Sequence, residues 1–189
     1  SYKYFQSYQD KIYKLIGIHD QRVKIKQLYP KYFHTHDGVK IDNIVSLHFR
    51  IGDYKHIQSC HHILTMKYYI AAVNEIIKQL NNAHLFFICF SKKQDEKAIN
   101  EKIQQLRTTF PTCLFASCDY TMPDWQQLLL MSCCQHHVLA NSTFSWWAAY
   151  LNDYKSKRVI YPNKWFGPQL NNLCTTDMFP SNWHRIMED

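Results

Sequence analysis

The chain has 189 residues, of which 46% are apolar and only four are glycine, and its formal net charge is +7. This length fits one domain with a sizeable core. The positive excess lies in residues 1–40, which hold 8 Lys and Arg against 3 Asp and Glu, whereas residues 41–189 hold 14 against 12. A charge excess confined to one flank does not favour nucleic acid as a partner. The patterns GxGxxG and GxxxxGK[ST] do not occur, which excludes the common glycine-rich phosphate loops.

The cysteine content indicates a cellular compartment. The chain has seven cysteines, an odd number, and contains no CxxC pair. We therefore predict free, mostly buried thiols in a reducing compartment, with a disulfide framework or a zinc site as less favoured alternatives. No stretch approaches 18 uninterrupted apolar residues, so no transmembrane segment is expected in this chain. The free thiols favour a cytoplasmic protein, and a membrane-associated one stays open.

The first part of the chain is aromatic, basic and irregular. We interpret residues 1–43 as an arm with a linking helix, and residues 44–189 as the domain that follows. Within the arm, residues 10–28 are predicted to form the helix. Its apolar side is expected to consist of Ile12, Leu15, Ile16 and Val23.

From residue 44 onward, strands and helices are predicted to alternate. Five apolar runs predict strands, at residues 44–49, 84–90, 113–116, 137–140 and 158–161. Four stretches between them predict helices, at residues 65–80, 94–108, 124–134 and 144–151. Such alternation is typical of an α/β domain with a Rossmann-like parallel sheet and helices on both faces. Ligands of such sheets lie beyond the carboxyl ends of the strands, near a switch in strand order.

The first candidate site is His48-Phe49-Arg50-Ile51-Gly52-Asp53-Tyr54, at the end of the first predicted strand. Alternate residues share a face of a strand, so His48 and Arg50 point the same way, toward the expected crevice. The planar guanidinium of Arg50 suits a diphosphate because it donates two charge-assisted hydrogen bonds at once. Gly52 allows the chain to turn, and Asp53 can fix the turn or orient Arg50. The alternative is an Arg-Asp pair that serves only as a structural clamp.

The second candidate site runs from Asn141 to Trp147, after the fourth predicted strand. Its first polar residues can cap a helix, whose free N–H groups attract anions. The hydroxyl groups of Ser142, Thr143 and Ser145 can add hydrogen-bond donors. The aromatic residues Phe144, Trp146 and Trp147 offer apolar walls for a base or a sugar. Ordinary helix capping with core aromatics is the alternative.

Two pairs of adjacent histidines are candidate metal ligands. Adjacent histidines on a strand point to opposite faces, and neither His61-His62 nor His136-His137 has a third ligand at a fitting spacing. We therefore expect no metal.

Together these residues resemble a known family, the α-1,2-fucosyltransferases of glycosyltransferase family 11. His48, Arg50, Gly52, Asp53 and Tyr54 match its motif H-x-R-x-G-D-Y. A second motif, M-S-x-C-x-H followed by A-N-S-T-F-S-W-W, is similar to residues 131–147, although a second cysteine, Cys134, stands in it. The segments Y-F-Q-S at residues 4–7 and Y-P-N-K-W-F at residues 161–166 also resemble the family.

The resemblance implies a two-domain transferase of the GT-B type, of which this chain is the C-terminal, donor-binding domain. The family's opening G-G-L-G-N-Q-M-F segment is absent, so an N-terminal domain of the same polypeptide is expected to be missing. The expected donor is GDP-fucose and the expected acceptor a glycan, commonly a galactoside. The reaction implied is inverting, gives an α-1,2 linkage and needs no metal or other cofactor.

The resemblance also implies roles for individual residues. Arg50 is expected to hold the diphosphate with assistance from His48, and both are catalytic candidates. Asp53 is a candidate for the base, although a base from the missing half is an equal alternative. The donor pocket is expected to be lined by Asn141, Ser142, Thr143, Phe144 and Ser145.

Two other functions stay open. A catalytically inactive copy could bind GDP, or bind a glycan through Trp146 and Trp165, and transfer nothing. A related transferase could use another acceptor, as in protein O-fucosylation. The M-S-x-C and W-W features favour the family named above over this last alternative.

Overall fold

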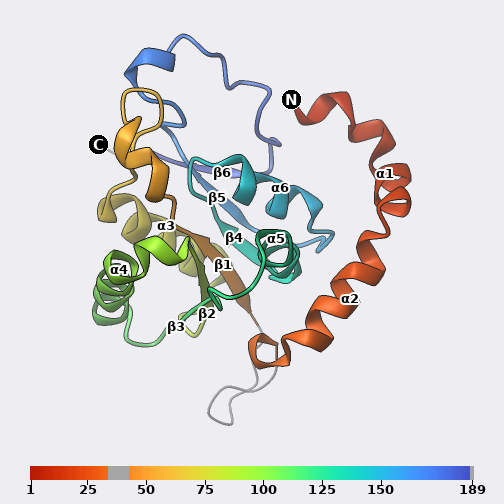
Figure 1. Cartoon of the computed structure of the whole chain (residues 1–189), viewed down its shortest axis with the longest axis horizontal. Helices are drawn as coiled ribbons and strands as arrows, with labels where there is room; N and C mark the ends of the chain where they lie inside the picture. The colour runs from red at the N-terminus through yellow and green to blue at the C-terminus, as the bar shows by residue number, and fades with distance from the viewer. Residues whose placement is uncertain (34–42, 188–189) are drawn as a thin grey trace.

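The computed structural model describes residues 1–33 and 43–187, which form a three-layer α/β domain flanked by an N-terminal arm (Figure 1). Its centre is a six-stranded sheet in the order β3-β2-β1-β4-β5-β6, and every neighbouring pair is parallel. The strands are β1 (Ile44–His48), β2 (Phe86–Phe90), β3 (Leu114–Ser117), β4 (His136–Val138), β5 (Val159–Pro162) and β6 (His184–Ile186). This is the strand order of the Rossmann fold, so the predicted fold class is confirmed.

The helices cover both faces of the sheet. The main ones are α3 (Met66–Leu80), α4 (Glu96–Thr109), α5 (Asp124–Cys133) and α6 (Thr143–Leu151). Consecutive strand residues point to opposite faces, so Val45 and Leu47 pack with α3 and α4, whereas Ile44 packs with α5. The five predicted strands and four predicted helices of this part are all present, with ends within two residues of the predicted ones.

Short 3₁₀ helices complete the described chain. They are η1 (Tyr2–Tyr4), η2 (Gln6–Tyr8), η3 (Pro30–Tyr32), η4 (Gly52–His56), η5 (Lys93–Asp95) and η6 (Pro168–Leu170). Of these, η4 and η5 follow β1 and β2 and therefore lie at the carboxyl edge of the sheet.

The arm contains two helices where the sequence predicted one. They are α1 (Gln9–Leu15) and α2 (Ile18–Leu28), separated by Gly17 in the left-handed conformation with φ of 59°. The predicted apolar side was wrong: Leu15, Ile16 and Val23 are exposed, and the buried residues are Tyr13, Ile18 and Ile25. These three belong to the same core cluster as α5, so the packing partner, and not the local pattern, sets which side faces inward.

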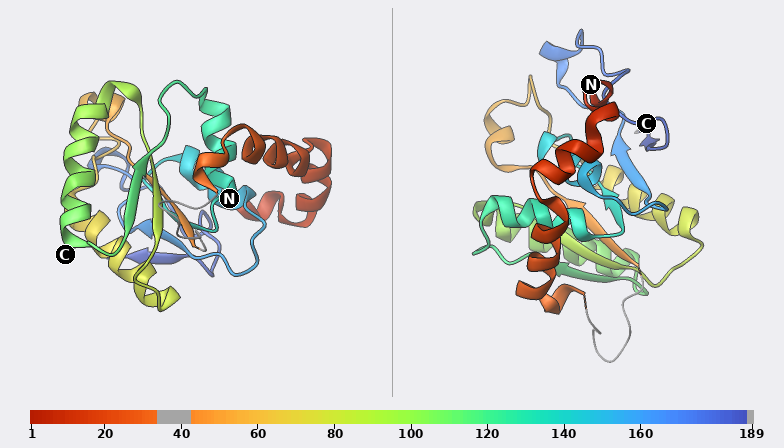
Figure 2. Two further views of the ribbon diagram at one scale, coloured as in Figure 1. Left: turned by 90° about the horizontal axis from the view of Figure 1, so that it is seen from below. Right: turned by 90° about the vertical axis from the view of Figure 1, so that its right-hand side faces the viewer.

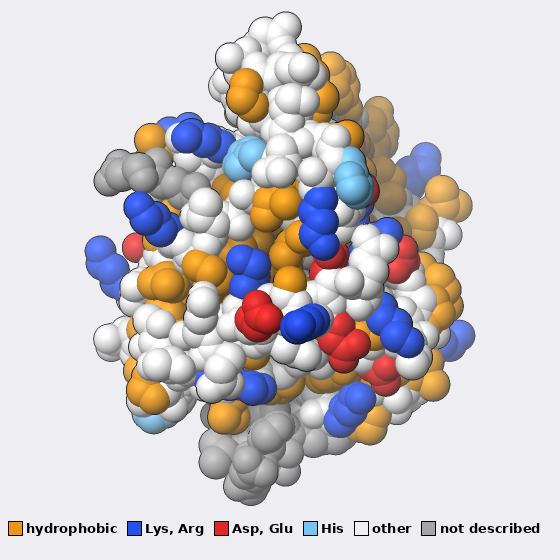
Figure 3. Space-filling view, turned by 60° about the vertical axis from the view of Figure 1, so that its left-hand side comes forward, with side chains coloured by type: hydrophobic (Ala, Val, Ile, Leu, Met, Phe, Trp, Pro, Cys, Tyr) orange, Lys and Arg blue, Asp and Glu red, His pale blue; other side chains and the backbone are white. Residues whose placement is uncertain are grey.

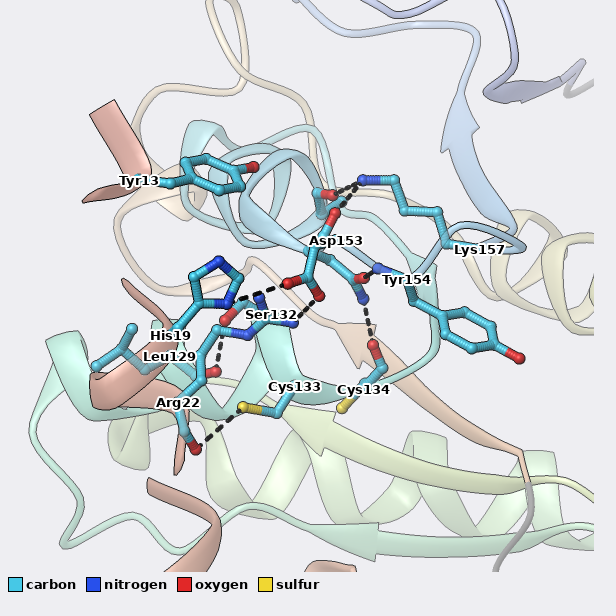
Figure 4. A network of polar contacts seen from close by, with 12 residues as sticks. Tyr13, His19, Arg22, Leu129, Ser132, Cys133, Cys134, Asp153, Tyr154 and Lys157 are labelled. Atoms are coloured by element: carbon cyan, nitrogen blue, oxygen red, sulfur yellow. Dashed lines mark hydrogen bonds and ion pairs between the residues drawn. The ribbon is translucent and has the colours of Figure 1, made fainter. Parts of the chain in front are cut away.

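Polar contacts fix the arm along one flank of the domain (Figures 2 and 4). Arg22 of α2 donates to Asp153 at 2.6 Å, and His19 Nδ1 lies 3.4 Å from the same carboxylate. The thiol of Cys133 donates to the Arg22 carbonyl at 3.8 Å. Phe5 stacks on Trp147 with ring centroids 5.2 Å apart. Residues 1–33 therefore share a core with the domain that follows. Residues 34–42 of the predicted arm lie outside the described residues, and the division between residues 43 and 44 stays a prediction.

The sixth strand was not predicted. β6 has only three residues, two of them exposed, and pairs with β5 at the edge of the sheet. Such a short polar segment has no apolar alternation that could reveal a strand. All seven cysteines are free thiols, as predicted, and five of them are buried. Among the described residues, no helix is both long and apolar enough to span a bilayer.

Candidate functional site

The two sequence motifs meet at one point of the sheet. The strand order turns at β1 and β4, which are direct neighbours although β2 and β3 lie between them in the chain. The register pairs Leu47 with Val138, so the chain after β1 and the chain after β4 leave the sheet at the same level. Ligands of open α/β sheets bind at such a switch point, beyond the carboxyl ends of the strands.

Arg50 lies half-buried at this edge and keeps hydrogen-bonding capacity. Its side chain is 21% exposed, and its Nη2 donates to Asp53 Oδ2 at 2.8 Å. Its guanidinium carbon lies 5.3 Å from the centre of the Tyr54 ring. Its Nε is buried and has no partner. A buried guanidinium donor without an acceptor is costly unless a ligand supplies one, which makes Arg50 suited to an anion.

His48 is a neutral imidazole in this setting. Burial, and to a lesser degree the charge of Arg50, lower its pKa to about 3. Because the folded pKa lies far below the ordinary value of 6.5, the ring carries no charge at neutral pH and can contribute one N–H donor. Its Nδ1 is buried without a partner, and its ring centre lies 5.6 Å from that of Phe144. The two motifs therefore touch through His48 and Phe144.

Tyr54 connects the two motifs by a hydrogen bond. It lies in η4, is buried, and its hydroxyl donates to the Asn141 carbonyl at 2.9 Å. Its ring contacts the Arg50 guanidinium and is stacked with His61 at 5.0 Å. The motif tyrosine thus supports the arginine and holds the end of β4 in place.

We predict that Tyr54→Phe loosens this connection. The change leaves the buried Asn141 carbonyl without its donor, which should lower the free energy of unfolding by about 1–3 kcal/mol. The matched control is Tyr150→Phe, because the buried Tyr150 hydroxyl has no partner and its removal should be neutral or stabilising. Urea unfolding of both variants measures the difference. Equal stability of the two variants would show that the Tyr54 bridge contributes nothing.

The hydroxyl groups of the second motif differ in their partners and in their exposure. Ser142 is the N-cap of α6, and its Oγ accepts the Phe144 N–H at 3.3 Å. Ser145 is buried, and its hydroxyl lies 3.3 Å from the Ala140 carbonyl and 3.2 Å from the Ser142 carbonyl, both acceptors. Thr143 is exposed at the first position of the helix. Among these hydroxyls, that of Thr143 is the most accessible to a ligand, and the donor-binding role of the set stays a prediction.

Asn141 holds three segments together. Its Nδ2 donates to the His62 carbonyl at 2.9 Å and to the Trp165 carbonyl at 3.2 Å, while its Oδ1 is buried without a partner. The side chain therefore joins the end of β4 to residues 57–62 and residues 163–167, and still presents an acceptor.

These two segments border the candidate site, although no sequence pattern assigned them to it. His61 Nδ1 and His62 Nε2 are buried without partners beside the first motif. Burial, followed by the charge of Lys164, lowers the pKa of His62. The P-N-K-W-F segment resembles the family, but no local pattern indicates that it packs against residues 57–62.

The face shown in Figure 3 carries both signs of charge around an apolar depression, with histidine side chains beside it. A mixed face of this kind suits one small anion held by a few placed cations better than a polyanion.

The tryptophans and histidines considered for glycan and metal binding do not form an open site. Trp146 and Trp165 are buried, and Trp146 stacks on Tyr150 with ring centres 5.0 Å apart, so neither offers an open face to a glycan. His137 contacts Ser46 and Asn152 through its two ring nitrogens, at 2.7 and 2.8 Å. The described part of the chain contains no group of three or more His, Cys, Asp or Glu that could hold a metal ion.

Six parallel strands in Rossmann order, with an arginine and a helix N-terminus at the switch point, define an α/β protein with an anion-suited site. Residues 1–187 match the sequence profile of Glycosyl transferase family 11, and the chain belongs to this family.

Curated relatives agree with the family. The O-antigen biosynthesis glycosyltransferase WbnK of Escherichia coli is 33% identical over 138 residues, which cover 71% of this chain and 43% of that protein. The alpha-1,2-colitosyltransferase of Escherichia coli is 26% identical over 201 residues, which cover 97% of this chain and 59% of that protein. The chain thus spans about half the length of these relatives.

Solved structures show weaker similarity. The E. coli ADP-heptose lps heptosyltransferase II has a TM-score of 0.49 at 14% identity, covering 88% of this chain and 43% of that chain. The family 9 glycosyl transferase from Veillonella parvula has a TM-score of 0.46 at 12% identity, covering 89% of this chain and 40% of that chain.

Proposed function

We propose that this chain is the donor-binding portion of a fucosyltransferase that moves L-fucose from GDP-fucose to a galactoside hydroxyl, with inversion and an α-1,2 linkage. The observation that carries the proposal is Arg50, whose buried Nε lacks an acceptor at the β1–β4 switch point. A diphosphate bound there would supply that acceptor. The membership of the chain in a glycosyltransferase family supports a nucleotide sugar as the ligand.

The proposed reaction is a direct displacement. The acceptor oxygen forms a bond to the anomeric carbon, the bond from that carbon to the diphosphate oxygen breaks, and a base takes the acceptor proton. Negative charge grows on the departing diphosphate, so donors aimed at it are most useful in the transition state. Arg50 supplies a cation and His48 a neutral N–H, and no metal is required for this step.

The base that takes the acceptor proton has two candidates, Asp53 and a group from the rest of the polypeptide. Asp53 remains a candidate, but its carboxylate accepts a hydrogen bond from Arg50 at 2.8 Å, which is the geometry of an orienting partner. In the proposed reaction, Asp53 therefore holds the guanidinium, and the base can equally come from the rest of the polypeptide.

The linkage rests on the relatives. One curated relative is named as an alpha-1,2-colitosyltransferase and the other as an O-antigen glycosyltransferase. Their names support transfer to a glycan, and the first supports a 1,2 linkage. The donor GDP-fucose rests on the motif resemblance alone.

The test is calorimetric titration of this chain with GDP in the presence of EDTA, beside UDP and ADP at the same concentrations. We expect saturable binding of GDP and at least tenfold weaker binding of the other two, because guanine recognition is a property of the donor site. Preference for UDP or ADP would overturn the proposed donor. Folded protein that binds none of the three would overturn the proposal of a self-sufficient donor domain.

A second measurement separates an enzyme from an inactive binding copy. GDP-fucose is incubated with the chain and a β-galactoside, and the released GDP and the fucosylated product are measured. GDP binding without any transfer, also after addition of the N-terminal half of a family member, would favour the inactive GDP-binding module.

A further inference from the structure

A buried carboxylate lies behind the first motif and belongs to neither motif. Asp95 ends η5, after β2, and its side chain is only 2% exposed. Its Oδ2 accepts the Gly52 N–H at 2.7 Å, and its Oδ1 accepts from Lys55 Nζ at 2.9 Å. Both donors belong to η4, the turn that follows Arg50.

The contact with Gly52 satisfies the first N–H group of η4. The first N–H groups of a helix have no partner within the helix, and a carboxylate both satisfies them and suits the local dipole. Asp95 performs this role for η4 from the end of the neighbouring strand, since β1 and β2 pair in parallel with His48 opposite Phe90.

The same contact places η5 close to Gly52. A Cβ on Gly52 would lie 2.8 Å from Gln94 Nε2 and 3.3 Å from Asp95 Oδ2. A side chain at this position would require the flexible end of Gln94 to move and the Asp95 carboxylate to shift by a few tenths of an ångström.

The turn held by Asp95 carries both groups that hold Arg50. Asp53 accepts a hydrogen bond from the guanidinium, and the Tyr54 ring lies beneath it. A shift of η4 would therefore move Arg50 and also the Tyr54 hydroxyl that bonds the end of β4.

We propose that Asp95 is a positioning residue of the donor site: by binding Gly52 and Lys55 it fixes η4 and thereby aims Arg50 at the diphosphate. This inference rests on the proposed function, since it takes the ligand of Arg50 to be the diphosphate of a nucleotide. Asp95 itself does not contact the ligand.

The test compares the affinities of the chain for GDP and for GMP, which lacks the second phosphate, by calorimetry. For Asp95→Ala we expect the GDP affinity to fall about 10-fold, as for the loss of a charge-assisted hydrogen bond, with the GMP affinity within about twofold of wild type. The matched control is Glu96→Ala, which removes an exposed carboxylate one residue away and should leave the GDP affinity unchanged.

Asp95→Asn keeps the test decisive if the alanine variant folds poorly. The amide oxygen can still accept from Gly52, but the charge that holds Lys55 is lost, so the ratio of GDP to GMP affinity should fall about threefold. A ratio equal to that of wild type in the folded variants would overturn the positioning role. An equal loss for both nucleotides would show a merely structural effect and overturn it as well.

Failure of the proposed function gives a different result. Wild-type chain that is folded and binds no GDP would remove the donor site and this inference with it. Normal GDP binding by wild type and by both Asp95 variants would overturn this inference alone.

Discussion

Replacing Arg50 with alanine is expected to lower the GDP affinity of the chain by roughly 100-fold, because the site loses two charge-assisted hydrogen bonds of about 1.5 kcal/mol or more each. The fold should survive, since the side chain is partly exposed and its ion pair with Asp53 lies at the surface. Such exposed pairs contribute little to stability. Calorimetric titration with GDP and thermal unfolding of the same preparation measure the two quantities separately.

Arg50→Lys distinguishes charge from geometry. Lysine keeps the positive charge but cannot donate in the planar, two-pronged way of a guanidinium, so an intermediate loss is expected. The control is Arg158→Ala, which removes an exposed arginine just before β5, at the opposite edge of the sheet. In a preparation that transfers fucose, Arg50→Ala activity within tenfold of wild type would contradict the catalytic role.

The second large effect is expected from Gly167→Ala. A Cβ at this position would lie 2.5 Å from the Ser59 carbonyl oxygen and 2.6 Å from that of Gln58. Both atoms belong to the backbone and cannot rotate away, so the two segments must separate. Overpacking of this kind costs about 1–3 kcal/mol. For a chain of this size we expect the melting temperature to fall by roughly 3–10 °C.

The displacement caused by Gly167→Ala should also disturb the candidate site. Gly167 N–H donates to the Cys60 carbonyl at 2.6 Å, and this contact holds residues 57–62 where His61 stacks on Tyr54. We therefore expect a weaker affinity for GDP together with the lower melting temperature.

Gly17→Ala is the matched control for Gly167. Gly17 has a φ of 59° and nothing within 4 Å of an added Cβ, so only the left-handed backbone is penalised, by about 1–2 kcal/mol. The control lies in the arm and should leave the GDP affinity intact. A Gly167→Ala protein with wild-type melting temperature and GDP affinity would show that the two segments are not held together as described.

The sequence alone was sufficient for five of the six strands, for the four main helices and for the two motifs. Strand runs such as residues 86–90 are apolar throughout, and α3 and α4 have a clear helical period, so each element is specified by its own residues. The alternation of strand and helix then restricts the fold to a parallel sheet, whose carboxyl edge is where the motifs had to lie. For this reason His48 and Arg50 could be predicted as candidate site residues from the sequence.

Other features depend on residues that are distant in the chain, and only the tertiary structure decided them. Nothing near Asp95 in sequence indicates that its carboxylate reaches Gly52, 43 positions earlier. The inward side of the arm was chosen by α5, because both sides of its helices carry apolar residues. β6 exists because β5 offers it an edge to pair with. Local patterns record what a segment can form, whereas the choice among compatible partners is made by burial and hydrogen bonding between segments.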